Sequence, residues 1–242
     1  MKKLKIRHFI QEPSHCAVAT TAMVSNYYNP DVTYDLAKKI IIDNKVVKTT
    51  NEGLADGEIG LSLNYMGFKK VTFVTSDLNC FDYRWAKLSK NKLLEKMKEA
   101  RNKINVDDRE QIRPLYRWLK KKKFDNKIII DYNFGKYIRK FLNDNKPVII
   151  AFNWNMFFRC SKEKNNGRED DIRGDWKYHS VIIYGYNKNR AFICDSHEEY
   201  YKYKLKRFRK GFYTISWENL MTIMGIGHIF LPDNYDKDSI KK

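Results

Sequence analysis

The stretch from Ser14 to Pro30 contains no Lys, Arg, Asp or Glu, although 31% of the 242 residues are charged. Its letters, SHCAVATTAMVSNYYNP, are mostly small and apolar, which is typical of a helix buried in a hydrophobic core. Ser14 can cap such a helix, and Asn29-Pro30 ends it. The sequence therefore predicts a central buried helix over about residues 15–28, around which the other elements must pack.

The remaining pattern divides into a helical half and a strand-rich half. The first half predicts helices at 33–42 and 56–66, with strands at 4–10 and 70–75. The second half predicts helices at 134–143 and 217–224, a polar loop at 153–176, and strands at 128–130, 147–152, 178–186, 190–195, 211–215 and 226–231. Asn187-Lys188-Asn189 indicates a hairpin between two of these strands. Helices followed by a mostly antiparallel sheet predict an α+β fold.

The middle of the chain differs in charge. From Arg84 to Phe124, 15 Lys or Arg stand against 5 Asp or Glu, so this segment carries +10 of the total +18. Apolar residues recur in it at helical spacing, in two stripes: Leu93, Leu94, Met97 and Ile104, then Ile112, Leu115, Tyr116 and Leu119. We expect a single domain over residues 1–242 with a basic helical insertion at about 84–124.

The positive charge of the insertion favours an acidic protein or a nucleic acid as partner. A second basic stretch with interleaved aromatic residues, 200–213, suits nucleic-acid contact as well. Both stretches equally suit a solvated basic face, and no nucleic-acid-binding motif accompanies them.

Cysteine usage and hydropathy suggest where the protein works. The four cysteines, at 16, 80, 160 and 194, are irregularly spaced and form no CxxC pair, so we expect reduced thiols in the cytoplasm. The basic N-terminus lacks the apolar stretch of a signal peptide, and no apolar run is long enough to span a membrane.

Cys16 opens the predicted central helix. Backbone N–H groups and the helix dipole at that position stabilise an anion, and the thiolate is the reactive form of cysteine. Acyl chemistry also requires donors for a developing oxyanion. The Cys16 backbone N–H can supply one donor, and the side-chain amide of Gln11 can supply the other.

The base that such chemistry needs is expected to be His179. It begins the strand 178–186, and Asp195 ends the strand 190–195, so the hairpin brings the two residues opposite each other. Asp195 can then accept from the imidazole ring and orient it. A register slip by one residue stays open. His8 and His15 are expected at the surface, and His228 is expected to be packed or at the surface.

These residues together resemble a known family. Gln11-x4-Cys16 at the start of a buried helix, the strand Lys146-Pro-Val-Ile-Ile150, and His179-Ser-Val-Ile-Ile-Tyr-Gly-Tyr followed by Asp195 are similar to the papain-like cysteine peptidases that process bacteriocins with double-glycine leaders. The resemblance covers about 1–75 and 146–231. It implies a papain-like fold, with the central catalytic helix packed on the C-terminal sheet, and a stand-alone peptidase without transporter domains.

The resemblance implies catalytic roles for Cys16 as nucleophile, His179 as base, Asp195 as orienting residue and Gln11 in the oxyanion hole. We therefore expect a cysteine hydrolase that cleaves a peptide or isopeptide-type bond through a thioester, acting on a peptide or protein and needing no cofactor. The alternatives are an acyltransferase or transpeptidase on the same scaffold, and an inactive binding module that uses the basic surface. A zinc site at Cys194, His197 and His179 is a weaker alternative, because it lacks paired ligands.

Overall fold

The computed structural model describes residues 1–50, 53–102, 106–164, 168–197, 210–225 and 227–240. Its α-helices are α1 (Cys16–Tyr28), α2 (Tyr34–Asp43), α3 (Asp56–Tyr65), α4 (Lys90–Ala100), α5 (Val106–Leu119), α6 (Phe134–Asn143), α7 (Trp154–Phe158) and α8 (Trp217–Ile223). The strands are β1 (Lys2–Lys3), β2 (Phe68–Thr75), β3 (Lys127–Ile130), β4 (Val148–Asn153), β5 (Tyr178–Tyr186), β6 (Arg190–Cys194), β7 (Phe212–Ser216) and β8 (His228–Tyr235). Short 3-10 helices lie at η1 (Tyr83–Lys87) and η3 (Lys237–Ser239).

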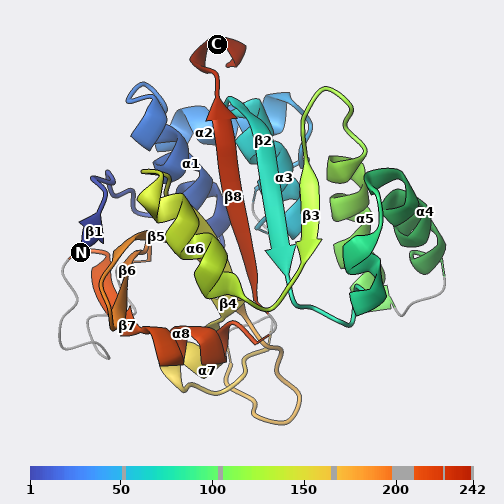
Figure 1. Ribbon diagram of the computed structural model, residues 1–242. Coiled ribbons are helices and arrows are strands. Elements are labelled where there is room, and N and C mark those ends of the chain that lie inside the picture. The colour runs from blue at the N-terminus through green and yellow to red at the C-terminus, as the bar shows by residue number, and fades with distance from the viewer. Residues whose placement is uncertain (51–52, 103–105, 165–167, 198–209, 226, 241–242) are drawn as a thin grey trace.

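Within the described residues the strands form one sheet, in the order β3-β2-β8-β4-β5-β6-β7, and β1 pairs with β5 (Figure 1). Every pairing is antiparallel except that of β2 with β3. The predicted α+β class is therefore confirmed. The central strands β4 and β8 are apolar at successive positions, because helices cover both faces of the sheet there.

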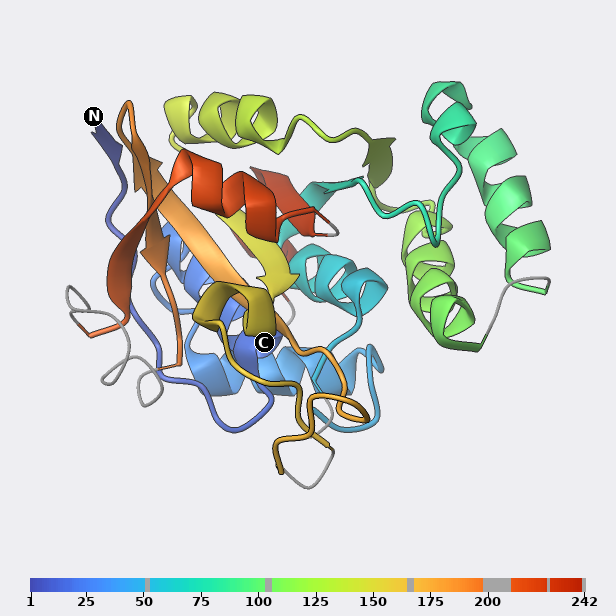
Figure 2. The same ribbon diagram turned by 90° about the horizontal axis from the view of Figure 1, so that it is seen from below.

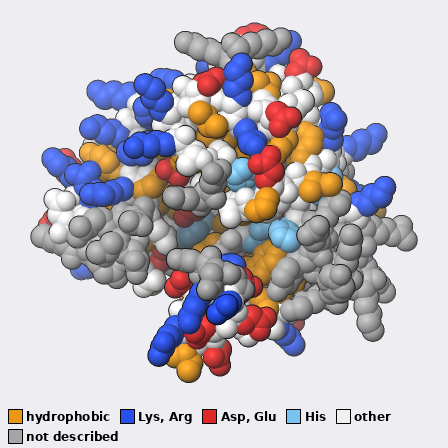
Figure 3. All heavy atoms as spheres, turned by 180° about the vertical axis from the view of Figure 1, so that it is seen from behind, with side chains coloured by type: hydrophobic (Ala, Val, Ile, Leu, Met, Phe, Trp, Pro, Cys, Tyr) orange, Lys and Arg blue, Asp and Glu red, His pale blue; other side chains and the backbone are white. Residues whose placement is uncertain are grey.

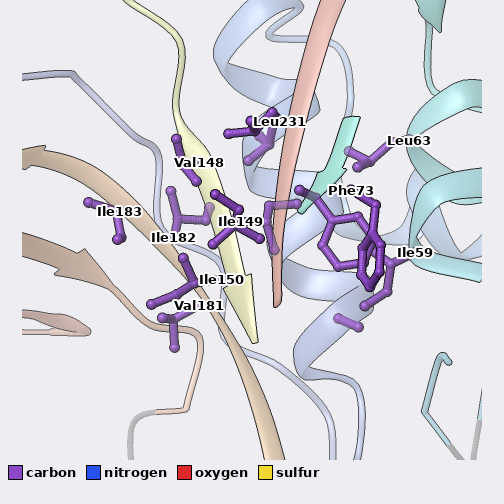
Figure 4. Close-up of a cluster of buried hydrophobic side chains, with 14 of the residues drawn as sticks. Ile59, Leu63, Phe73, Val148, Ile149, Ile150, Val181, Ile182, Ile183 and Leu231 are labelled. Atoms are coloured by element: carbon purple, nitrogen blue, oxygen red, sulfur yellow. The ribbon is translucent and has the colours of Figure 1, made fainter. Parts of the chain in front are cut away.

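Helices α1, α2 and α3 lie on one face of the sheet, and α6 and α8 lie on the other (Figures 1 and 2). All residues of α1 from Ala17 to Asn26 are buried, which confirms the predicted central helix. Its uncharged sequence follows from this position, because no side of the helix reaches water. Side chains of α3, β2, β4, β5 and β8 fill the core beside it (Figure 4).

Three local predictions are wrong. Ser14 is not the N-cap: it has a φ of 63°, and His15 precedes α1 without a side-chain cap. Residues 4–10 form no strand, since β1 ends at Lys3. The predicted loop 153–176 begins with α7, because the Asn153 side chain accepts from the Met156 N–H and starts a helical turn.

The basic segment forms η1, α4 and α5, set to one side of the sheet (Figure 2). Leu93, Met97, Ile112, Leu115 and Leu119 of its predicted stripes are buried, whereas Ile104 lies outside the described residues. A buried hydrogen bond ties α5 to the helical layer, because Trp118 Nε1 donates to Asn64 Oδ1 at 3.1 Å. Asn126 Nδ2 donates to the same oxygen at 3.0 Å.

Glycine allows α3 and α5 to approach closely. A Cβ at Gly57 would lie 2.0 Å from the backbone carbon of Pro114, and one at Gly60 would lie 2.6 Å from Trp118 Nε1. The first contact is with backbone, so it cannot be relieved by a side-chain rotation. Any residue larger than glycine at position 57 must push the two helices apart.

We predict that Gly57→Ala lowers the free energy of unfolding by about 2 kcal/mol or more, because overpacking a rigid contact strains the fold. Gly135→Ala is the matched control: Gly135 is also the second residue of a helix, but its nearest Cβ neighbour is Arg139 at 3.6 Å. The control should be neutral or stabilising by up to about 1 kcal/mol, from helix propensity. Urea unfolding of both variants measures the difference, and equal effects would contradict the prediction.

Candidate active site

Cys16 is the first residue of α1 and is partly accessible. The first turn of a helix leaves backbone N–H groups without intrahelical partners, so the sulfur lies in a positive local field. The backbone N–H of Ser180 donates to the sulfur, and the ring of His179 forms a hydrogen bond with it. Both partners come from the start of β5, which α1 crosses; Thr20 Oγ1 and Ser180 Oγ, 3.1 Å apart, fix this crossing.

His179 lies between Cys16 and Asp195. Its Nε2 donates to Asp195 Oδ1 at 2.8 Å, which leaves Nδ1 for the Cys16 sulfur. The Trp154 ring packs edge-on against the imidazole, with centroids 4.8 Å apart and planes at 80°. The ring of His179 is therefore fixed in orientation by a carboxylate on one side and an indole on its face.

A shift in strand register brings Asp195 to His179. Near the site, Ile182 of β5 pairs with Cys194 of β6. Closer to the hairpin turn, the pairing of these two strands is displaced by one residue. Continuing the pairing past Cys194 places Asp195 opposite Val181. Val181 and His179 are two residues apart on β5 and therefore share a face of the strand, so Asp195 lies on the same face as His179. Without the shift, Asp195 would lie on the other face of the hairpin.

The carboxylate of Asp195 is fully buried, with 0% of the residue exposed. Besides His179, its oxygens accept from the backbone N–H of His197 at 3.0 Å and from the Tyr213 hydroxyl at 2.9 Å. Its backbone oxygen accepts from His8 Nε2 at 2.6 Å. This set of donors offsets the desolvation of a buried anion.

Gln11 is held beside the same loop. Its backbone N–H donates to Ser196 O at 3.0 Å, and its side-chain oxygen accepts from Ser196 Oγ at 2.8 Å. The Gln11 amide nitrogen lies 3.4 Å from Glu12 O, a long contact. Gln11 lines a cavity of about 570 Å³ together with Cys16, His179 and Trp154. The structure thus brings together all four residues that the sequence singled out.

The electrostatics favour an ionised pair. Burial tends to raise the pKa of Cys16, but the hydrogen bond and charge of His179 and the Ser180 N–H outweigh it, so the pKa of this thiol is lowered. Burial tends to lower the pKa of His179, but the Asp195 charge and hydrogen bond and the Cys16 sulfur raise it to about 10. By contrast, burial raises the pKa of Cys194, whose sulfur packs against Met23.

A second cavity, of about 210 Å³, adjoins the first. Cys16, Ala17, Tyr178 and His179 line both of them, and Asp56, Ser180 and His228 line only the smaller one. Histidine side chains are visible in a hollow on this face of the molecule (Figure 3). The nucleophile candidate is therefore accessible at the junction of two cavities.

Several residues were placed wrongly or missed from the sequence. His15, expected at the surface, is buried, and its Nδ1 lies 2.9 Å from the Tyr34 hydroxyl oxygen. His8 is half-buried against the Asp195 loop. Trp154 and Tyr213 were not identified at all. Trp154 directly follows the apolar strand β4, which pairs with the strand of His179, and this position is a signal that could have found it.

In the part of the chain that the structure describes, His, Cys, Asp and Glu side chains form no group of three or more that could hold a metal ion. Among the same residues, every helix is too short or too polar to span a bilayer.

Three solved structures are similar to the chain over nearly its whole length. Similar solved structures include a double glycine motif protease from an AMS/PCAT transporter in complex with a leader peptide (14% identity, 96% of this chain and 95% of that chain, TM-score 0.43). They also include the peptidase domain of Streptococcus ComA, an ABC transporter of a quorum-sensing pathway (13% identity, 96% and 100%, TM-score 0.42). A third is a C39-like peptidase from Bacillus anthracis (13% identity, 98% and 100%, TM-score 0.43).

No curated protein sequence matches the chain. The family model described as Peptidase_C39 like, however, matches residues 3–223, which is most of the 242-residue chain. The resemblance inferred from the sequence is thereby confirmed, and the papain-like α+β fold agrees with it. The chain belongs to the C39-like peptidase family and is a cysteine peptidase.

Proposed function

We propose that the protein hydrolyses a peptide or isopeptide-type bond with Cys16 as nucleophile, His179 as general base and Asp195 as the residue that orients His179. Nδ1 of His179 takes the thiol proton, and the thiolate attacks the substrate carbonyl carbon. The Cys16 N–H and the Gln11 amide donate to the oxyanion that forms. His179 then gives its proton to the leaving amine, and a thioester remains on Cys16.

Hydrolysis of the thioester completes the cycle. His179 takes a proton from water, hydroxide attacks the thioester carbonyl, and the carboxylic acid leaves as the thiol is restored. The single observation that carries this proposal is the chain of contacts from the Cys16 sulfur through the two ring nitrogens of His179 to the buried Asp195. A structural cysteine in a core requires no such chain.

Ser196 supports the role of Gln11 in this scheme. Its hydroxyl donates to the amide oxygen of Gln11, and this bond turns the amide nitrogen away from Ser196. Since Asp195 is the adjacent residue, one short loop orients both the base and the oxyanion donor.

A basic groove suggests the chemistry of the substrate at a distance from the scissile bond. A cavity of about 440 Å³ between the α2–α3 connection and α5 is lined by Lys45, Arg101, Arg117 and Lys120 to Lys122. It shares Lys45 and Arg117 with a larger one of about 1200 Å³, which reaches Gly53 and Ala55 beside the active-site cavities. Charge complementarity and this continuity favour an acidic segment of a protein substrate in the groove.

We predict that Cys16 is alkylated by iodoacetamide at lower pH than the other cysteines. Its alkylation rate should rise with pH through a midpoint below the ordinary thiol pKa of about 8.5. At a pH below both values, Cys16 should react about tenfold faster than an ordinary thiol for each unit that separates the two pKa values. His179→Gln should move the midpoint upward, because it removes the imidazolium partner. Mass spectrometry resolves the four sites; Cys160, also partly accessible, is the internal control. Equal rates at Cys16 and Cys160 would contradict the proposal.

A second prediction concerns the basic limb of the pH profile. The charge of Asp195 raises the pKa of His179 to about 10, so the imidazolium persists into the alkaline range. Asp195→Asn removes that charge, so the pKa of His179 should fall and the alkaline limb of kcat/KM should move to lower pH by about one to two units. The measurement is the pH profile on the best-cleaved member of a peptide library. Asp31→Asn, which removes an exposed charge beyond the far end of α1, should leave the limb in place; an unchanged limb in Asp195→Asn would refute the role.

The groove is tested by replacing Lys120, Lys121 and Lys122 with Ser. Lys123 is kept, because its ammonium packs over the Tyr65 ring at 4.4 Å. We expect the variant to bind acidic peptides about tenfold more weakly at low salt and to show a flatter salt dependence, while Cys16 alkylation is unchanged.

The control for the groove replaces three exposed lysines away from it, Lys136, Lys140 and Lys188. Equal losses of binding in both triple variants would show that only net charge matters. If the native protein binds duplex DNA but not acidic peptides, the groove is a nucleic-acid site instead.

A further inference from the structure

The smaller cavity beside Cys16 is acidic in a chain of net charge +18. Asp56, the first residue of α3, lines it, and no Lys or Arg occurs among the described residues that do so. The buried carboxylate of Asp77 adds to the negative field at Asp56. His179, which also lines the cavity, is already engaged by Cys16 and Asp195.

The carboxylate of Asp56 is incompletely compensated. Oδ2 lies 3.3 Å from His228 Nε2, and within the described residues Oδ1 has no hydrogen-bond or ion-pair partner. Burial raises the pKa of Asp56, and His228 is the only nearby group that opposes this effect in the part of the chain described. A carboxylate that is largely shielded from water, with one oxygen lacking a donor from the described protein, favours a cationic ligand that supplies one.

His228 is itself fixed by its surroundings. Its Nδ1 lies 2.9 Å from the Thr75 hydroxyl oxygen, which accepts from the Asp77 N–H at 3.0 Å. The Thr75 hydroxyl thus holds one ring nitrogen of His228, and the other ring nitrogen faces Asp56. His228 therefore engages one carboxylate oxygen of Asp56, Oδ2, and leaves the other to a ligand.

The other walls suit a slender aliphatic chain with a cationic end. Leu54, Ile59 and Ala151 add apolar surface to the cavity that Cys16 and Asp56 line. Tyr178 offers an aromatic ring at the same cavity, and its hydroxyl lies in the field of Asp77 and Asp56, which with burial raises its pKa to about 12. An ammonium group interacts favourably with both a carboxylate and an aromatic face.

We propose that this cavity is a subsite for a lysine-like side chain of the substrate next to the cleaved bond, with Asp56 as the residue that selects it. The inference rests on the proposed function, because it takes Cys16 as the attacking group. The methylenes of the side chain lie against Leu54 and Ile59, and the ammonium group donates to Asp56. Norleucine has the same aliphatic chain without the ammonium group and is therefore the discriminating analogue.

The test is protection of Cys16 from iodoacetamide by two blocked tripeptides, acetyl-Gly-Lys-Gly-amide and acetyl-Gly-norleucine-Gly-amide. Iodoacetamide is uncharged, so its rate responds to occupancy of the cavity rather than to surface charge. The lysine peptide should protect native Cys16 at a concentration about tenfold lower than the norleucine peptide. The reason is that a hydrogen bond from its ammonium group to the Asp56 carboxylate adds to the free energy of binding. Asp56→Asn should abolish this difference, and the matched charge control Asp31→Asn should retain it.

Equal protection by the two peptides in the native protein would overturn the subsite, as would a lysine advantage that survives Asp56→Asn. Thermal unfolding confirms that each variant is folded. Failure of the proposed function gives a different result: Cys16 would then react no faster than Cys160 in the absence of peptide. Because alkylation of Cys16 is read by mass spectrometry whether or not a peptide is cleaved, the two failures are distinguishable.

Discussion

Burial of the Asp195 carboxylate is the constraint on which this site depends. A carboxylate with no exposure to water is tolerated only where donors surround it, and here they come from β5, from the loop after β6 and from β7. The N-terminal segment joins them through His8, which bonds the Asp195 carbonyl oxygen. Segments far apart in the chain must therefore be in place before His179 has a fixed orientation, so the arrangement of Cys16, His179 and Asp195 depends on complete assembly of the sheet.

The sequence predicted the parts of the site that local chemistry determines. An uncharged helix must be buried, a cysteine at its start is acidified, and a hairpin turn brings its two strand ends together. The approach of His179 to Asp195 was predictable in this sense, but the register was not, because one extra residue within β5 decides which face Asp195 takes. Tyr213 was missed for a related reason. Its contact depends on the pairing of β6 with β7, and no sequence pattern predicted the register of that pairing.

Some predictions were wrong because a tertiary contact overrode a local sequence preference. Ser14 has the right chemistry for an N-cap, but the chain turns there with a positive φ so that His15 can be buried against Tyr34. Residues 4–10 alternate like a strand, yet they leave the sheet after β1 and run to the loop of Asp195 and Ser196. The second basic stretch, 200–213, lies mostly outside the described residues, so its predicted role stays a prediction.

The basic insertion and the acidic cavity are linked through one helix–helix contact. Asp56 opens α3, and the next residue, Gly57, is pressed against the backbone of Pro114 in α5. Gln111, one turn earlier in α5, lines the same cavity as Asp56 and Cys16. The basic segment thus builds one wall beside Cys16, and its Lys and Arg side chains line the cationic groove. Opposite charges therefore gather in two neighbouring cavities: Lys and Arg side chains line the groove, and Asp56 of α3 lines the cavity beside Cys16. A substrate with an acidic segment and a lysine near the cleaved bond would match both sides of this division, whereas the reverse arrangement would be repelled at both.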